Sequence, residues 1–416
     1  MRILWFCNTS SLYKSQERGY NGGGWISSLE TLVSKQPGIT LGISFFDNDE
    51  NFRVARGNTT YYPISIYSRS SAKIKHNIFY SRFDEVETKT FLSIVEDFKP
   101  DLIHIFGSEQ SFGLIAPFVT VPVVIHIQGI LGPYLNAMFA PGTNKFDYLR
   151  HMRIAEAIKK FRELRFFSHN AIREERILAN CKYFMGRTHW DKAIVQLHNP
   201  RAEYFYCSEI LRQEFYQAKA WVQNYSPDDV RIVSTLSKTD YKGFDLILKA
   251  AALLKKFTNT DFTWAVYGIK DYSFWEKKLG MEASKLNIKL MGVASSDTLI
   301  KALQSADIFV HPSYIDNSPN SVCEAQYLGV PVIATNVGGV SSLVDHGRTG
   351  MLVPANDPYS LAQTILRLHH DPAYATAISA EGRITAMHRH DVNSILEQNL
   401  TIYKCILEKT YHAPLL

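Results

Sequence analysis

The sequence predicts an α/β protein with two domains, each built from alternating strands and helices around a parallel sheet. The chain has 416 residues, which is more than one hydrophobic core usually organises. Residues 3–7 form an apolar run, and a polar loop with three glycines leads from it to an apolar-periodic helix, Ile26 to Val33. The same alternation of strand, loop and helix begins again after residue 229. Two Rossmann-like domains are therefore expected.

The first domain contains further apolar runs that predict buried strands. They cover residues 39–46, 60–67, 101–107 and 121–129, and an amphipathic helix runs from Thr88 to Phe98. Glycine-bearing loops follow the last two strands and carry Glu109 and Gln128, and Arg187 lies at the end of a strand that begins at residue 183. Open α/β sheets bind ligands beyond the carboxyl ends of their strands. Glu109, Gln128 and Arg187 are therefore candidate substrate contacts.

The second domain begins after a polar segment, Asn224–Asp229, that is typical of a linker. Its predicted strands cover residues 231–237, 262–268 and 289–292, and its helices cover 244–256 and 299–305. A last helix, Val392 to Leu407, has one apolar face. We divide the chain into a first domain of residues 1–222, a second domain of 223–390 and a C-terminal helical segment of 391–416.

The most informative stretch is residues 309–339, which read FVHPSYIDNSPNSVCEAQYLGVPVIATNVGG. The pattern predicts a buried strand, a loop, a helix that ends at Gly329, and a strand from Val332 to Thr335. Asn317 or Ser318 is expected to cap the helix, with Pro319 in its first position.

The start of this helix is a predicted anion site, because its free amides and positive dipole end favour a phosphate. Glu324 lies roughly 7–8 Å along the helix, and Asp316 lies in the preceding loop. The arrangement suits a nucleotide-sugar, with ribose hydroxyls at Glu324 and the transferred sugar at Asp316. The alternative is a capped helix with two solvated acids.

The stretch resembles the donor site of family 4 glycosyltransferases, in which two glutamates are separated by seven residues. Here seven residues separate Asp316 from Glu324, and the first acid is shorter by one methylene. The resemblance implies the GT-B fold, in which two Rossmann-like domains face each other across a cleft and the C-terminal helix crosses back to the first domain. It implies donor binding by Glu324, Asn317, Ser318, Asn320, Ser321, Val322, Lys238, Gly22, Gly23, Gly24, Gly338 and Gly339.

Lys242, which precedes Gly243, resembles the lysine that binds the donor phosphates in this family. The family's nearby arginine is absent, and Lys238 is the closest point charge. Gln128 stands where the family often has a histidine. The resemblance therefore implies catalytic roles for Asp316, Lys242 and Gln128, and an acceptor site in the first domain that includes Glu109 and Arg187.

The predicted function is transfer of a hexose-type sugar, with retention of anomeric configuration, from a nucleoside-diphosphate sugar to a glycan or lipid-linked acceptor. Surface polysaccharide synthesis is the expected context, and no nucleic acid is expected as a partner. No metal is expected either, because the single Asp-x-Asp sequence, Asp47-Asn48-Asp49, is more typical of a turn. Two alternatives are a catalytically reduced nucleotide-sugar-binding subunit and a nicotinamide oxidoreductase, although the latter lacks GxGxxG.

The five scattered cysteines and the absence of a long apolar stretch predict a cytoplasmic protein. Residues 145–176 form a predicted helical region with nine Lys or Arg and five Asp or Glu, interleaved with phenylalanines. Such a segment can lie on the anionic inner face of the cell membrane. The alternative is a solvated helix whose aromatic residues pack into the first domain.

Overall fold

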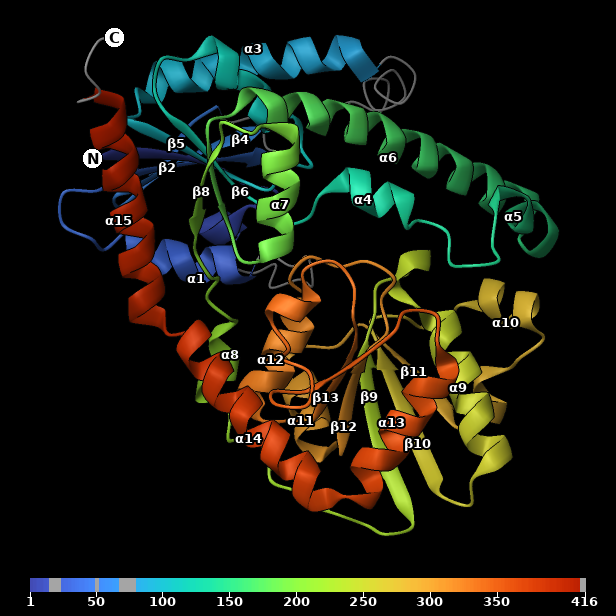
Figure 1. Cartoon of the computed structure of the whole chain (residues 1–416). Helices are drawn as coiled ribbons and strands as arrows, with labels where there is room; N and C mark the ends of the chain where they lie inside the picture. The colour runs from blue at the N-terminus through green and yellow to red at the C-terminus, as the bar shows by residue number, and fades with distance from the viewer. Residues whose placement is uncertain (15–23, 49–51, 67–79, 412–416) are drawn as a thin grey trace. The chain divides into compact units, whose positions relative to one another are not determined.

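A computed structural model describes residues 1–14, 24–48, 52–66 and 80–411 of the chain. The chain forms two compact units. Unit 1 contains Met1–Gly132, Phe166–Ile210 and His390–Leu416, and unit 2 contains Pro133–Arg165 and Leu211–Arg389. Each unit has its own sheet (Figure 1).

The sheet of unit 1 has the strand order β3-β4-β2-β1-β5-β6-β7-β8. All neighbouring strands are parallel except β3 and β4. The strands are β1 (Arg2–Phe6), β2 (Thr40–Phe46), β3 (Val54–Arg56), β4 (Thr59–Ile64), β5 (Leu102–Phe106), β6 (Val123–His126), β7 (Tyr183–Gly186) and β8 (Glu203–Tyr206). The apolar runs of the sequence thus form a buried parallel sheet, as predicted.

The helices of unit 1 bury apolar side chains. They are η1 (Ser11–Lys14), α1 (Gly24–Val33), α3 (Tyr80–Phe98), η2 (Ser111–Phe118), α7 (His189–His198), the later part of α6 (Ile154–Asn180) and α15 (Val392–Tyr411). The C-terminal helix α15 returns to unit 1, as expected. The Tyr403 hydroxyl lies 2.6 Å from His104 Nδ1, and Asn399 Nδ2 donates to Cys207 Sγ over 3.2 Å.

The sheet of unit 2 is parallel, with the order β11-β10-β9-β12-β13-β14. Its strands are β9 (Asp229–Thr235), β10 (Asp261–Tyr267), β11 (Ile288–Gly292), β12 (Ile308–His311), β13 (Val332–Thr335) and β14 (Met351–Val353). Its helices are α8 (Gln213–Gln217), η3 (Asp240–Lys242), α9 (Phe244–Phe257), α10 (Ser273–Leu279), η4 (Ala283–Leu286), α11 (Ser296–Ser305), α12 (Asn320–Leu328), η5 (Val340–Ser342), α13 (Pro358–His370) and α14 (Pro372–Arg389).

Unit 2 also includes residues 133–165, here called the 133–165 segment, which were expected in the first domain. The segment contains the end of α4 (Leu131–Asn136), all of α5 (Lys145–His151) and the start of α6. Tyr148 is fully buried in the core of unit 2 and donates a hydrogen bond to Asp240. Lys278 pairs with Asp147 at 2.7 Å. The periodicity predicted helices here, but it did not indicate which core their apolar face joins.

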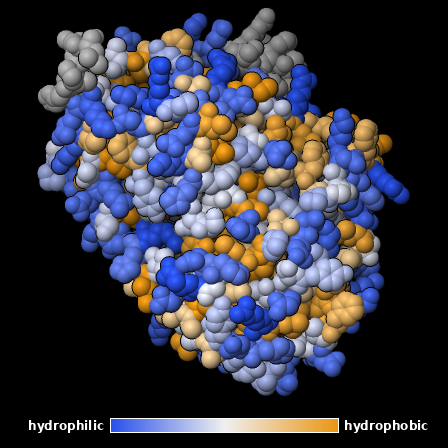
Figure 2. Space-filling model, viewed as in Figure 1, coloured by the Kyte–Doolittle hydropathy of each residue, from blue (hydrophilic) through white to orange (hydrophobic). Residues whose placement is uncertain are grey.

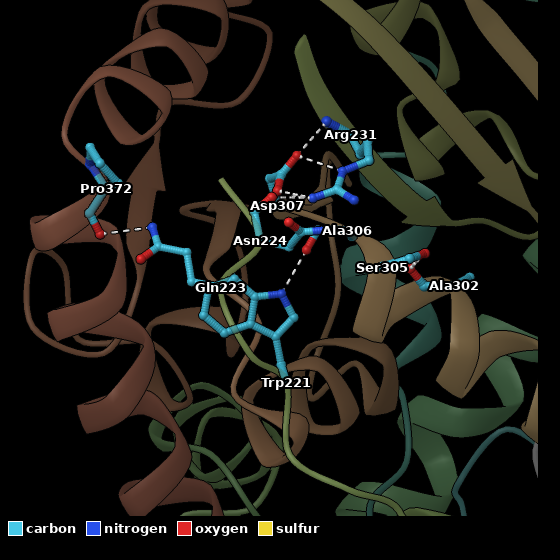
Figure 3. A network of polar contacts seen from close by, with 9 residues as sticks. All are labelled: Trp221, Gln223, Asn224, Arg231, Ala302, Ser305, Ala306, Asp307 and Pro372. Atoms are coloured by element: carbon cyan, nitrogen blue, oxygen red, sulfur yellow. Dashed lines mark hydrogen bonds and ion pairs between the residues drawn. The ribbon is translucent and has the colours of Figure 1, made fainter. Parts of the chain in front are cut away.

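The main part of unit 2 begins at Leu211, whereas the second domain was predicted to begin at residue 223. Trp221 Nε1 donates to the Ala306 carbonyl over 2.7 Å, and Gln223 donates to Pro372 over 3.0 Å (Figure 3). Arg231 binds Asp307 and the carbonyl of Asn224 (Figure 3). The predicted linker, Asn224–Asp229, and the residues just before it are therefore held on unit 2 by hydrogen bonds from side chains to backbone carbonyls.

Candidate functional site

The candidate site of unit 2 lies where β12 ends and α12 begins. The sequence prediction for the helix start is wrong by one position: Pro319 is the N-cap, its backbone is extended, and no side chain caps the helix. The first helical hydrogen bond runs from Val322 N to Pro319 O over 3.0 Å, so the amides of Asn320 and Ser321 precede it. Among the residues that the structure describes, Ser318 Oγ is buried without a hydrogen-bond partner. The loop thus presents polar groups suited to an anionic ligand.

Asp316 is the centre of a buried group of charged side chains. Lys242 Nζ donates to Asp316 Oδ2 over 2.6 Å, and His311 Nε2 lies 3.1 Å from the same oxygen. Burial alone would raise the pKa of Asp316, but the ammonium of Lys242 and the imidazole of His311 hold it well below its usual range. Burial lowers the pKa of His311 more than the Asp316 carboxylate raises it. At neutral pH the group therefore consists of a carboxylate, an ammonium and a neutral imidazole.

Two glycines allow the surrounding loops to approach this group. Gly243, which follows Lys242, has φ +77°, and a Cβ there would lie 2.0 Å from the Pro312 carbonyl oxygen. Gly338 has φ +50°, and a Cβ there would lie 2.0 Å from the Asp316 carbonyl oxygen. Gly339 N donates to that oxygen over 3.0 Å. The predicted donor loop at Gly338 and Gly339 therefore supports the backbone of Asp316.

Tyr134 of the 133–165 segment joins the same group and was missed in the sequence. Its hydroxyl accepts a hydrogen bond from Asn317 N over 3.1 Å and donates to Asp316 Oδ1 over 3.4 Å. The Tyr134 ring packs against Tyr241, with ring centroids 5.4 Å apart. No local pattern marks this residue, because its partners lie more than 180 positions away in sequence.

Glu324 lies within α12 and is buried. Arg212 donates to both of its carboxylate oxygens, with each donor and acceptor 2.7 Å apart. Burial raises the pKa of Glu324 more than the Arg212 guanidinium lowers it. Arg212 also donates to Ser296 Oγ over 3.2 Å and lies over the Phe215 ring. Arg212 belongs to an aromatic-rich stretch without a clear period, so no sequence signal identified it.

The remaining donor candidates are less closely grouped. Lys238 is exposed and pairs with Asp271 at 3.1 Å. The Val322 side chain is fully buried in the core, so only its backbone can serve a ligand. Gly22 and Gly23 lie outside the described residues, whereas Gly24 begins α1. Asp49 of the Asp-x-Asp sequence also lies outside the described residues.

The acceptor candidates lie in unit 1, where β5, β6 and β7 end. Glu109 Oε1 accepts a hydrogen bond from Gly129 N over 2.9 Å, next to Gln128 in the chain. Arg187 is buried and pairs with Glu209 at 2.8 Å, so its charge is compensated inside unit 1. The three candidates thus follow three neighbouring strands, but in this state Arg187 is not presented to solvent.

A second buried acid, Glu174 of α6, belongs to this region and was also missed. Its oxygens accept hydrogen bonds from Ser108 Oγ and Leu131 N, both over 2.5 Å. Burial raises the pKa of Glu109 to about 7, against backbone hydrogen bonds that lower it. Burial and the nearby Glu109 raise the pKa of Glu174 to about 8. This edge therefore holds two carboxyl groups that keep a protonated fraction near neutral pH.

Comparison with known proteins finds a family match within the second unit. Residues 228–371 match the profile of the family described as Glycosyl transferases group 1. An amylovoran biosynthesis glycosyltransferase of Erwinia amylovora is 28% identical over 152 residues, which are 35% of this chain and 37% of that protein. A D-inositol 3-phosphate glycosyltransferase of an Arthrobacter species is 33% identical over 153 residues, 35% of each chain. The match therefore spans little more than a third of these relatives.

Similar solved structures cover almost the whole chain. Sucrose-phosphate synthase from Thermosynechococcus elongatus has a TM-score of 0.72 at 16% identity, over 97% of this chain and 98% of that one. HepE from Anabaena, solved in complex with UDP, has a TM-score of 0.64 at 14% identity, over 97% of this chain and 100% of that one. These likenesses confirm the predicted fold.

Proposed function

Because the chain has the GT-B fold and carries a glycosyl transferases group 1 domain at residues 228–371, we propose that it is a glycosyltransferase that uses a nucleoside-diphosphate sugar. The observation that carries this proposal is the buried group of Asp316, Lys242 and His311 beside the start of α12. A fixed cation and the positive end of a helix suit a diphosphate. HepE, a structural neighbour, has been solved with UDP-glucose, which is consistent with a donor of this class.

The proposed roles follow from the charges. Transfer breaks the bond between the sugar C1 and the phosphate oxygen, and negative charge grows on the departing diphosphate. Lys242 and the amides at the start of α12 would stabilise that charge. Asp316 would accept a hydrogen bond from the transferred sugar, and Glu324 from the ribose. In the retaining course, the acceptor oxygen bonds to C1 on the face that the diphosphate leaves, and its proton passes to the diphosphate. We propose that no metal is required, because Lys242 supplies the charge.

A donor screen tests this proposal. The purified chain is titrated calorimetrically with UDP-, GDP- and ADP-sugars, and slow hydrolysis of each is followed by mass spectrometry, with and without EDTA. We expect binding of one nucleotide class and EDTA-resistant hydrolysis, which Lys242→Met reduces. Binding without hydrolysis would favour the catalytically reduced subunit, and binding of NADH instead would refute a sugar transferase.

A hexose-type sugar and a glycan or lipid-linked acceptor at the edge of unit 1 complete the proposal. Glu109 and Gln128 are the proposed acceptor contacts, since a protonated carboxyl and an amide can both bond hydroxyl groups. Polysaccharide synthesis is the proposed context, because the relative from Erwinia amylovora is named for amylovoran biosynthesis.

Contact with an anionic membrane is proposed for the 133–165 segment. Its exposed apolar side chains include Phe146, Leu149, Ile154 and Ile158. Exposed cations are interspersed with them in the sequence: Lys145, Arg150, Arg153, Lys159, Arg162 and Arg165. Hydrophobic and hydrophilic residues are interspersed on the face seen in Figure 2. Within the described chain, no helix combines the length and apolar character needed to cross a membrane. The proposal is therefore surface contact.

Vesicle co-sedimentation tests the membrane proposal. We expect binding to vesicles with phosphatidylglycerol and little binding to neutral ones. Arg150→Glu with Arg153→Glu should abolish binding, while Lys285→Glu, an exposed charge change elsewhere on unit 2, should not. Equal binding to both vesicle types would refute it.

A further inference from the structure

The Tyr134 hydroxyl satisfies two groups of the proposed sugar subsite at once. Asn317 N needs an acceptor, and Tyr134 provides it at 3.1 Å. Asp316 Oδ1 needs a donor, and Tyr134 provides it at 3.4 Å. Asn317 is fully buried and Asp316 is 6% exposed, so leaving either group without a partner would be costly.

A phenol and a sugar hydroxyl have the same hydrogen-bonding capacity, one donated proton and two lone pairs. We propose that Tyr134 holds the place of one hydroxyl of the transferred sugar, and that the donor binds by displacing the phenol from Asp316 and Asn317. This inference rests on the proposed function, and it adds a specificity-determining residue outside the matched family region. A group that replaces the phenol must both accept and donate. The subsite thereby selects a hydroxyl over a carboxylate, a methyl group or a hydrogen.

The 133–165 segment is anchored independently of Tyr134. Tyr148 and Lys160 bind Asp240, which begins the turn that ends at Lys242. Lys278 pairs with Asp147, which is next to Tyr148 in the chain. Tyr134 itself is half-buried and rests on Tyr241. The Tyr134 side chain can therefore leave Asp316 while the anchor at Asp240 remains in place.

The exchange has a measurable consequence for affinity. The sugar must replace two existing hydrogen bonds, so its own contacts add little net binding in the wild type. A nucleotide-sugar should consequently bind the wild type only about as tightly as the nucleoside diphosphate. Tyr134→Phe keeps the ring against Tyr241 but removes the oxygen, so the sugar no longer has to displace a phenol from Asn317 N and Asp316 Oδ1. We expect this variant to bind the nucleotide-sugar about fivefold more tightly than the wild type.

The test is calorimetry of wild type and Tyr134→Phe with three pairs of probes: UDP and UDP-glucose, GDP and GDP-mannose, ADP and ADP-glucose. Tyr374→Phe is the matched control, since it removes a phenol hydrogen bond to the Gly347 carbonyl in the same unit. Only Tyr134→Phe should gain affinity, and only for the sugar-bearing member of the pair. With deoxyfluoro analogues of the bound sugar, the gain should disappear at one ring position, because fluorine cannot donate to Asp316.

The outcomes separate this inference from the proposed function. If wild type and Tyr134→Phe both bind no pair, the proposed function fails and the inference fails with it. If the wild type binds a pair but Tyr134→Phe gains nothing, or loses affinity for the sugar-bearing probe, the glycosyltransferase proposal stands and Tyr134 does not hold a hydroxyl's place. Binding that is measurable only with Tyr134→Phe supports both.

Discussion

Asp316, near the carboxyl end of one sheet, and Glu109 and Glu174, near that of the other, have pKa values shifted in opposite directions. In unit 2, Asp316 is buried against Lys242 and His311, which hold its pKa well below the usual range. In unit 1, Glu109 and Glu174 are buried against backbone amides and a serine hydroxyl, and their pKa values rise to about 7 and about 8. Burial raises the pKa at all three acids, so the depressed pKa of Asp316 comes from Lys242 and His311 together. Unit 2 thereby suits an anionic donor, and unit 1 suits a neutral, hydroxyl-bearing acceptor.

The largest expected effect comes from removing the cation of unit 2. Lys242→Met should reduce transfer by roughly 10²–10³-fold, about 3–4 kcal/mol, because the departing diphosphate loses its charge partner. It should also destabilise unit 2 by about 3 kcal/mol, because Asp316 stays buried without its ammonium. Urea unfolding and initial rates measure the two effects.

A double variant separates these two effects. Lys242→Met with Asp316→Asn removes the buried charge and should recover most of the stability, but none of the activity. If activity returns along with stability, Lys242 serves only to neutralise Asp316 and makes no contribution to transfer.

The next largest effect is a pH dependence of the stability of unit 1. The folded pKa values of Glu109 and Glu174 lie above the ordinary 4.5, so the folded state binds more protons than the unfolded state between about pH 4.5 and pH 8. Stability therefore falls as pH rises through this window, by several kcal/mol for the two groups together. Hydrogen exchange of β5 and β6 amides measures it.

The matched variant is Glu109→Gln with Glu174→Gln, which should flatten this dependence. Asp316 adds no slope in the same window, because its pKa is depressed: its stabilising contribution is present above its unfolded pKa and is lost only under strong acid. If the slope of stability against pH is unchanged in the double variant, the carboxyl ends of the two sheets do not differ in charge.

A smaller effect is expected at Arg212, whose guanidinium lowers the pKa of Glu324 against the larger rise that burial causes. Arg212→Gln should weaken nucleoside diphosphate binding roughly five- to tenfold, about 1 kcal/mol. The loss should be greater at pH 6 than at pH 8, since a protonated Glu324 accepts fewer hydrogen bonds from ribose. Calorimetry at both pH values measures this, and a loss independent of pH would assign Arg212 a direct contact with the nucleotide.

The smallest effect is expected at Lys238, the sequence-based substitute for the family's arginine. It is exposed and paired with Asp271, and such surface pairs contribute little. Lys238→Ala should change donor affinity by less than about twofold. A tenfold loss would show that Lys238 reaches the phosphates when the donor binds.

The sequence predicted the parts of this account that depend on local pattern. Strand β13 has the predicted bounds Val332–Thr335, and Gly329 ends α12 in the left-handed conformation. Asp316 and Lys242 were each predicted as site residues, whereas their ion pair was not. Tyr134 and Arg212 could not be predicted, because their contacts join distant segments and depend on which core the 133–165 segment and residues 211–217 pack against. His311 could have been found, since it ends a strand directly before the predicted site.

The most direct test of the account compares nucleoside diphosphate binding by Asp316→Asn and Glu324→Gln. If the donor lies with its sugar at Asp316 and its ribose at Glu324, calorimetry should give Asp316→Asn nearly the wild-type affinity for the nucleoside diphosphate while its turnover falls. Glu324→Gln should weaken the nucleoside diphosphate and the complete donor alike, by roughly tenfold. Equal losses of nucleoside diphosphate affinity in the two variants would contradict this placement of the donor.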